Sequence, residues 1–215
     1  MLDAARTGAW AKSGSPTPTA YGGLRFTAEA ANSSVQLTAV GSAPSVTLVK
    51  SFDGVNWEDY AVGEVIDLPS IGDFVYLAAG EGGNNAFGAS GSAYHKFVIN
   101  GLVAASGDIT SLRSFNLEQT TLATYCYYSM FSDCTGLTSA PELPATTLVP
   151  SCYRSMFSGC TQLSLIKVHF TAWGTQTNNW VSNVASTGTF YKPNALTEEH
   201  GTSKIPTGWT VVNID

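Results

Sequence analysis

The chain has 215 residues, a formal net charge of −6 and a charged fraction of only 12%. This length holds one large or two small domains, and the scarcity of charge together with 21 glycines favours strands and turns over long solvated helices. Because the chain has no basic run and no apolar run of about 18 residues, neither nucleic-acid binding nor membrane insertion is expected.

Residues 1–23 are predicted to form an N-terminal arm and linker. The stretch SGSPTPTAYGG (13–23) combines prolines, glycines and hydroxyl residues, a composition typical of linkers. The arm lacks the apolar core of a secretory signal peptide, so we expect either a fragment or a protein assembled in the cytoplasm. Leu2 and Trp10 are the residues expected to anchor the arm to a neighbouring protein.

A series of short alternating runs separated by turn residues follows the arm. Such spacing predicts an antiparallel β-sandwich over residues 24–110. The runs expected to form strands are 24–30, 34–40, 45–51, 55–62, 64–69, 73–79 and 94–101.

The segment SFDGVNW (51–57) resembles the Asp-box hairpin of sialidases, although it is one residue short of that spacing. Asp53 is predicted to accept hydrogen bonds from the amides of a turn, and Trp57 to be a packed anchor. The alternative is that Trp57 and Tyr60 form an exposed platform on which a sugar stacks.

Two near-copies of one segment occupy residues 117–142 and 143–168, with 13 identical positions and no gap. A period of 26 residues lies within the range of leucine-rich repeats. In the first copy, apolar residues recur every fourth position from Leu122 to Cys134, which predicts a short helix with one buried face. A turn and a short strand are expected to complete each unit.

All four cysteines of the chain lie at matching positions of the two copies. On a helix Cys126 and Cys134 would be about 12 Å apart, beyond the reach of a disulfide. Their spacing is also unlike the short C-x₂₋₄-C of zinc sites. We therefore predict four buried thiols, no metal and no cofactor.

The region after the repeats is predicted to cover the open end of the stack, because the last unit of a repeat array needs a cap. Trp180, Phe190 and Trp209 are the residues expected to do so. The predicted fold is mainly β with short helices, with the sandwich followed over residues 111–215 by a short capped leucine-rich-repeat stack.

The repeats YCYYSMFSDCTGLTSAPELP and SCYRSMFSGCTQLSLIKV resemble BspA-type leucine-rich repeats. The closing residues from NNWVSNV to IPTGWTV are similar to the end unit attached to such repeats. The preceding block is similar to β-domains found before them in proteins of gut anaerobes and their phages. This resemblance implies surface recognition and adhesion rather than catalysis.

No catalytic motif surrounds His95, His169 or His200, and no enzyme activity is expected. With the resemblance and the arm, the favoured function is a virion surface protein of the head-fibre, decoration or tail-fibre type. It would bind other virion proteins through the arm, form a homo-oligomer, and contact a host surface glycan or protein. A bacterial cell-surface adhesin and a carbohydrate-binding accessory module of an enzyme remain the alternatives.

The expected partner surface combines aromatic, basic and hydroxyl residues, because tyrosine and arginine are favoured at interfaces. The alternative for these positions is that they are merely solvated. The candidates are Trp57, Tyr60, Tyr127, Tyr128, Thr138, Tyr153, Arg154, Ser164 and Lys167.

Overall fold

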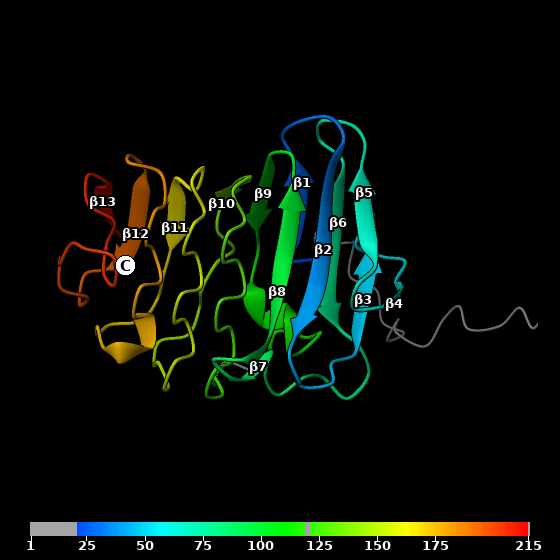
Figure 1. Ribbon diagram of the computed structural model, residues 1–215, viewed down its shortest axis with the longest axis horizontal. Coiled ribbons are helices and arrows are strands. Elements are labelled where there is room, and N and C mark those ends of the chain that lie inside the picture. Colours follow the sequence, from blue (N-terminus) through cyan, green and yellow to red (C-terminus); the bar gives the residue numbers. More distant parts are fainter. Residues whose placement is uncertain (1–20, 119–120, 215) are drawn as a thin grey trace, which may run out of the picture.

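Two β-sheets carry most of the regular structure in the computed structural model, which describes residues 21–118 and 121–214 (Figure 1). Within these residues the helices are two short 3-10 turns, η1 (Ile109–Leu112) and η2 (Thr175–Thr177). The prediction of a mainly β protein is therefore confirmed.

The smaller sheet is antiparallel and faces the viewer in Figure 1. Its strands alternate apolar side chains toward the interior with polar ones toward solvent, the pattern of a sheet with one solvated face. In spatial order they are β5 (Val65–Leu68), β2 (Ser33–Val40), β8 (Ala93–Asn100) and β7 (Gly88–Ser90).

The larger sheet has nine strands and forms the back layer of the molecule. Its strand β9 pairs antiparallel with β1 on one side and parallel with β10 on the other, so one sheet continues across residue 110. In spatial order the strands are β13 (Thr210–Ile214), β12 (Thr189–Pro193), β11 (Leu165–Lys167), β10 (Leu137–Ser139), β9 (Val103–Ser106), β1 (Arg25–Ala28), β6 (Phe74–Ala79), β3 (Leu48–Ser51) and β4 (Glu58–Tyr60).

The helix predicted between Leu122 and Cys134 is wrong. Residues 123–134 instead form consecutive β-turns, in which the N–H groups of even-numbered residues donate to the carbonyl three positions earlier. Tyr125, Ser129 and Asp133 are left-handed, with φ of 57°, 51° and 61°. A type II turn requires a left-handed third residue, so the turns that contain these residues are type II and alternate with turns of another type. The pattern of the ribbon therefore repeats every four residues, which is close to the period of a helix.

Three segments of this kind, which we call turn ribbons, comprise residues 123–134, 149–160 and 175–182. The N–H groups of odd-numbered residues in the first ribbon donate to carbonyls of the second, just as neighbouring strands bond. The first ribbon in turn accepts a hydrogen bond from Phe97 of β8 through the carbonyl of Met130. The ribbons therefore continue the four-stranded sheet, and together they form the front layer.

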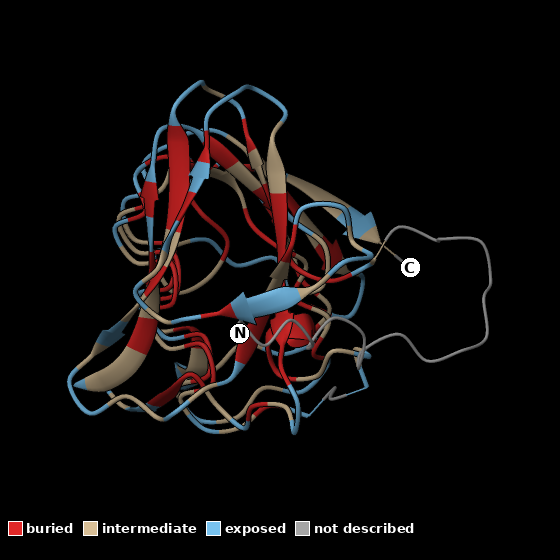
Figure 2. Ribbon diagram, turned by 90° about the vertical axis from the view of Figure 1, so that its right-hand side faces the viewer, coloured by how far each residue is buried: buried red, intermediate tan, exposed pale blue. Residues whose placement is uncertain are grey.

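One hydrophobic core fills the space between the two layers along the whole described chain. Phe26 of the back layer meets Phe97 of the front layer with ring centroids 4.9 Å apart. Figure 2 shows buried residues along the strands of both layers and exposed ones mostly in the loops. Burying one such phenylalanine contributes about 1.5–3 kcal/mol, so this interior holds the layers together.

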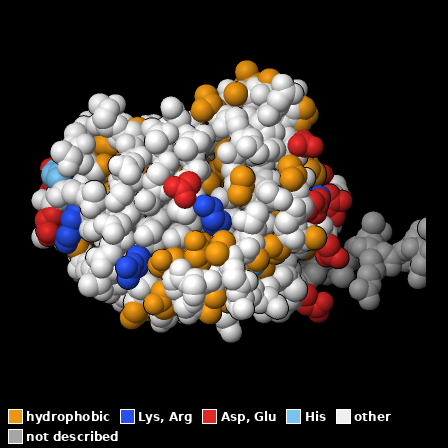
Figure 3. All heavy atoms as spheres, in the orientation of Figure 1, with side chains coloured by type: hydrophobic (Ala, Val, Ile, Leu, Met, Phe, Trp, Pro, Cys, Tyr) orange, Lys and Arg blue, Asp and Glu red, His pale blue; other side chains and the backbone are white. Residues whose placement is uncertain are grey.

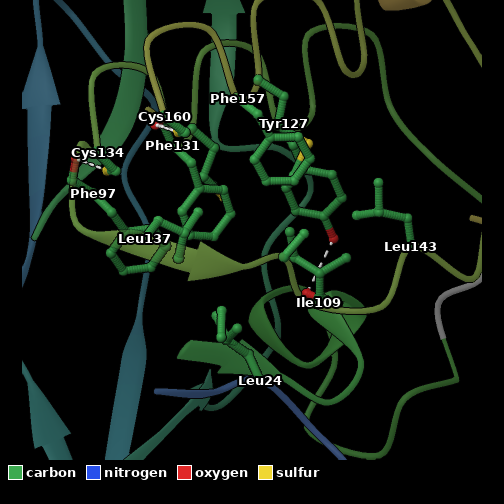
Figure 4. Packing of buried hydrophobic residues seen from close by; sticks show 14 of the residues in the cluster. Leu24, Phe97, Ile109, Tyr127, Phe131, Cys134, Leu137, Leu143, Phe157 and Cys160 are labelled. Atoms are coloured by element: carbon green, nitrogen blue, oxygen red, sulfur yellow. Dashed lines mark hydrogen bonds between the residues drawn. The ribbon is translucent and has the colours of Figure 1, made fainter. Parts of the chain in front are cut away.

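Aromatic rings stack through the core from one unit to the next (Figure 4). Phe97, Phe131 and Phe157 have successive centroid distances of 5.1 and 5.5 Å, with their planes within 20° of parallel. The residues predicted to cover the end of the stack are buried, and so are all four cysteines, which are free. These confirmed positions are Trp180, Phe190, Trp209, Cys126, Cys134, Cys152 and Cys160.

Candidate functional site

Four residues form a row across the outer face of the front layer. The register follows from equivalent hydrogen bonds, because Phe97 and Phe131 donate their N–H groups to Met130 and Met156. Between the ribbons, positions three residues before these phenylalanines are therefore aligned as well, and the ring contact of Tyr94 with Tyr128 places β8 beside them. We call the aligned set the front row: Tyr94 on β8, Tyr128 on the first ribbon, Arg154 on the second and Asn178 on the third.

The tyrosines of the front row form a small aromatic patch. The rings of Tyr94 and Tyr128 lie 5.1 Å apart edge to face, and Tyr125 adds a third ring 5.6 Å from Tyr128. All three side chains are half-buried. Figure 3 shows hydrophobic side chains gathered over the lower part of this face, beside basic ones. Rigid amphipathic rings of this kind supply contact area at low entropic cost.

Arg154 extends this patch with an exposed cation. Its side chain makes no hydrogen bond or ion pair with any residue in 21–118 or 121–214. Of the eight lysines and arginines in these ranges, the same is true of Arg25 alone; the other six are bonded to carboxylates or carbonyls. An arginine without a partner retains all its donors for an acceptor from outside.

The prediction of a surface position is wrong for three residues, because their side chains point into the core. Tyr60 is buried, accepts the N–H of Leu37 and donates to the carbonyl of Glu64. Tyr127 and Tyr153 are completely buried in a stacked pair with centroids 6.1 Å apart. In a turn ribbon the buried positions come as adjacent pairs, so each tyrosine that follows a core cysteine is buried with it.

Trp57 is a packed anchor, as predicted. It is half-buried and lies 4.9 Å edge to face from both Tyr21 and Phe115. The turn before it is also confirmed, because Oδ1 of Asp53 accepts N–H groups at 2.8 and 2.7 Å. Since Tyr60 points inward, these two residues do not form the shared sugar platform that was the alternative.

Thr138, Ser164 and Lys167 belong to the back layer, away from the front row. The hydroxyls of Thr138 and Ser164 donate to carbonyls of the preceding strand at 3.3 and 3.4 Å. The ammonium group of Lys167 lies 2.6 Å from Glu142, whose same oxygen is 2.7 Å from Nε2 of His169. The single surface predicted from the sequence is therefore divided between two faces.

Other expectations bear on the chemistry and on the arm. Among the described residues, no group of three or more His, Cys, Asp or Glu side chains is placed to hold a metal ion. None of the helices in these ranges is long and apolar enough to cross a membrane. The proposed anchors Leu2 and Trp10 lie outside the described residues.

The chain matches no protein-family model, no curated protein and no solved structure. Its candidate site is therefore defined by geometry alone, as the front row with Tyr125. Tyr128 and Arg154 were predicted, whereas Tyr94, Tyr125 and Asn178 were missed. Tyr94 lies outside the repeats, and only the pairing of β8 with the first ribbon aligns it with them.

Proposed function

We propose that the protein is a non-enzymatic surface-recognition protein of a virion, in which the front row contacts a host glycan or protein. The main support is that Arg154, which is exposed and has no partner among the described residues, lies beside half-buried tyrosines on one face. Tyrosine and arginine are the side chains most enriched among residues that dominate binding energy. The head-fibre, decoration and tail-fibre types all remain within this proposal.

The proposed architecture is a β-sandwich over residues 24–110 followed by a short capped leucine-rich-repeat stack. The sandwich is supported by the two sheets that pack through Phe26 and Phe97. The repeat stack is supported by one parallel strand per 26-residue unit, at β10 and β11. Residues 1–23 would attach the protein to other virion proteins, and a symmetric homo-oligomer would multiply weak contacts.

Binding to intact cells tests the recognition half of this proposal. The full-length protein, labelled with a fluorophore, is incubated with a panel of gut anaerobes, and bound label is measured. Arg154→Ala and Tyr128→Ala together should reduce binding at least about tenfold, since each truncation of a dominant contact costs 1 kcal/mol or more. Periodate treatment of the cells removes a glycan receptor, and protease treatment removes a protein receptor.

Lys167→Ala is the matched control, because it removes a cation from the back layer instead. It should leave cell binding unchanged. If both replacements reduce binding equally, the effect is one of net charge and the front row is not the contact. Thermal unfolding of each variant excludes a general loss of structure.

Mass spectrometry distinguishes the virion from the alternatives. Purified phage particles and host envelope fractions are searched for peptides of this chain. Stoichiometric recovery from particles supports a virion component. Recovery from envelopes alone contradicts it and favours a bacterial adhesin, while co-purification with a glycan-degrading enzyme favours an accessory module.

A further inference from the structure

Arg25 lies on the outer face of the back layer, opposite to the front row. In β1 the side chains of Phe26 and Ala28 point into the core, whereas Arg25 alternates with them and faces outward. Its Cζ atom is 4.0 Å from the ring centroid of Phe74 and 5.7 Å from that of Tyr76. The guanidinium is thus held over aromatic rings by cation–π contacts, with its position fixed before any ligand arrives.

The Nε–H group of Arg25 is buried and has no hydrogen-bond partner. A buried donor without a partner costs about 1–3 kcal/mol, and more when it is charged. The side chain also has no carboxylate partner within residues 21–118 and 121–214. Because no outside atom reaches Nε, its burial shows that the stem of the side chain is packed in place, and the outer Nη groups are the donors left for a ligand.

Aromatic side chains extend the site on one side of Arg25. Tyr76 leads to Trp57, with ring centroids 6.4 Å apart, and to Tyr21, 5.7 Å away. Trp57 is half-buried, so part of its indole faces outward. On this side the cation therefore borders a broad apolar surface.

A hollow of about 280 Å³ lies beside Phe74, which forms part of its wall and connects it to Arg25. Phe52, half of whose surface is exposed, provides a second ring. Asp67 and Asp73 also line the hollow, and their carboxylates can accept hydrogen bonds from hydroxyl groups. Its volume is close to the lower end for small-molecule sites, about 300 Å³.

We propose that Arg25, with the rings of Phe74, Tyr76 and Trp57, forms a second binding site, for the carboxylate of an acidic sugar. The guanidinium offers a planar fork that matches a carboxylate, and its two Nη groups, which are not among the buried atoms, are the donors. The aromatic rings cover the apolar face of the sugar ring, and a neighbouring sugar occupies the hollow beside Phe74. This site goes beyond the proposed function, because it does not involve the front row.

Titration calorimetry with two matched sugars tests the site. Sialyllactose carries a carboxylate and lactose is its neutral core, and a glucuronate disaccharide adds a second acidic sugar. The wild-type full chain should bind at least one acidic sugar and bind lactose at least about tenfold more weakly. Arg25→Gln should weaken acidic-sugar binding at least about tenfold, the loss expected when a charged hydrogen bond is removed. The emission of Trp57 should change on binding.

A second variant tests the site without removing Arg25. Ser106 of β9 is directly opposite Arg25 in the antiparallel register and is exposed. Opposite residues lie on one face with Cβ atoms about 5 Å apart, so Ser106→Glu places an internal carboxylate beside the guanidinium. It should abolish binding while keeping the fold, whereas the isosteric Ser106→Gln should bind like wild type.

Three outcomes would overturn the proposal. The first is equal binding of sialyllactose and lactose, or binding of neither acidic sugar by wild type. The second is unchanged binding by Arg25→Gln or Ser106→Glu. The third is binding of a glutamate-rich peptide but of no sugar, which replaces the ligand class. Because none of these variants alters Tyr128 or Arg154, failure here leaves the cell-binding test of the front row unaffected.

Discussion

The thiol of Cys160 donates a hydrogen bond to the carbonyl oxygen of Phe131 across 2.9 Å (Figure 4). Cys134 makes the same bond one unit earlier, to Phe97 at 3.2 Å. Phe97 belongs to the antiparallel strand β8. The first repeat is therefore attached to this strand by the same kind of thiol–carbonyl hydrogen bond that joins the two repeats to each other. The second cysteine of each unit is therefore a link between units as well as a core residue.

Replacement of the two cysteines of the second unit should separate these roles. Cys152 and Cys160 are both completely buried, but of these two thiols only that of Cys160 donates a hydrogen bond to a described residue. We expect Cys160→Ala to lower the free energy of unfolding by about 1 kcal/mol more than Cys152→Ala. Urea unfolding followed by tryptophan fluorescence measures both. Equal losses would show that the bond contributes nothing.

Stability should decrease at alkaline pH because the thiols are buried. Burial raises the pKa of all four, to about 12 for Cys134 and Cys152. The unfolded chain loses these protons near pH 8.5, so their contribution is complete below that pH and falls as pH rises toward 12. Each thiol lowers the free energy of unfolding by up to about 1.4 kcal/mol per pH unit.

Urea unfolding at pH 8, 8.5 and 9, below the range in which unfolded tyrosines titrate, measures this dependence. Cys134→Ala provides the control, because it removes one of four thiols and should reduce the slope by about a quarter. A slope that is the same in both proteins contradicts the assignment to the cysteines. Below pH 9 native thiols should also resist alkylation, whereas all four should react in denaturant.

The turn ribbon makes a prediction that a helix does not. Ser155 is left-handed, with φ of 55°, whereas Ser158 in the same ribbon does not have a positive φ. Glycine adopts the left-handed conformation without penalty but weakens regular positions by about 0.5–1 kcal/mol. Ser155→Gly should therefore maintain or raise the melting temperature, and Ser158→Gly should lower it. In a helix both would lower it, so a common decrease is the contradicting result.

The Asp53 turn should respond to acid. Hydrogen bonds from Asn56 and Val55 hold the pKa of the Asp53 carboxyl well below its usual range. Its contribution is therefore present above about pH 4 and is lost as the pH falls below that value. Asp53→Ala should melt below wild type at pH 5, and the gap should narrow at pH 2. Asp53→Asn keeps an oxygen acceptor, so its melting temperature at pH 5 should lie between those of wild type and Asp53→Ala. A difference between wild type and Asp53→Ala that is the same at pH 5 and pH 2 contradicts the assignment to this carboxyl.

Much of the strand content could be predicted from alternation of residue type. The runs 34–40 and 73–79 correspond closely to β2 and β6. β7 and β9 were missed, because β7 lies in a glycine-rich segment and β9 consists of small residues without alternation. The pairing of β9 with β10, which joins the two parts of the chain, is a long-range contact that no local pattern encodes.

The repeat unit was found from the sequence, but its helix was not correct. Apolar residues that recur at every fourth position fit both an α-helix and alternating type I and type II turns. The left-handed positions are Ser151, Ser155 and Gly159 in the second ribbon, Asn179 in the third and Asn183 directly after it. Glycine and asparagine tolerate this conformation, so Gly159 and the pair Asn179 and Asn183, four residues apart, are the signal that indicates turns. The burial of Tyr127 and Tyr153 follows from the same geometry.

The matching hydrogen bonds between the first two ribbons have a consequence for how such a chain can change length. A copy inserted between these ribbons would meet on both sides the hydrogen-bond pattern and the stacked phenylalanine ring that the two ribbons already share. Duplication of one unit in the gene therefore needs no new kind of junction. Each added copy would displace the last strands by about 4.8 Å, the spacing of neighbouring strands. The distance between β8 and β13 can thus evolve in fixed steps.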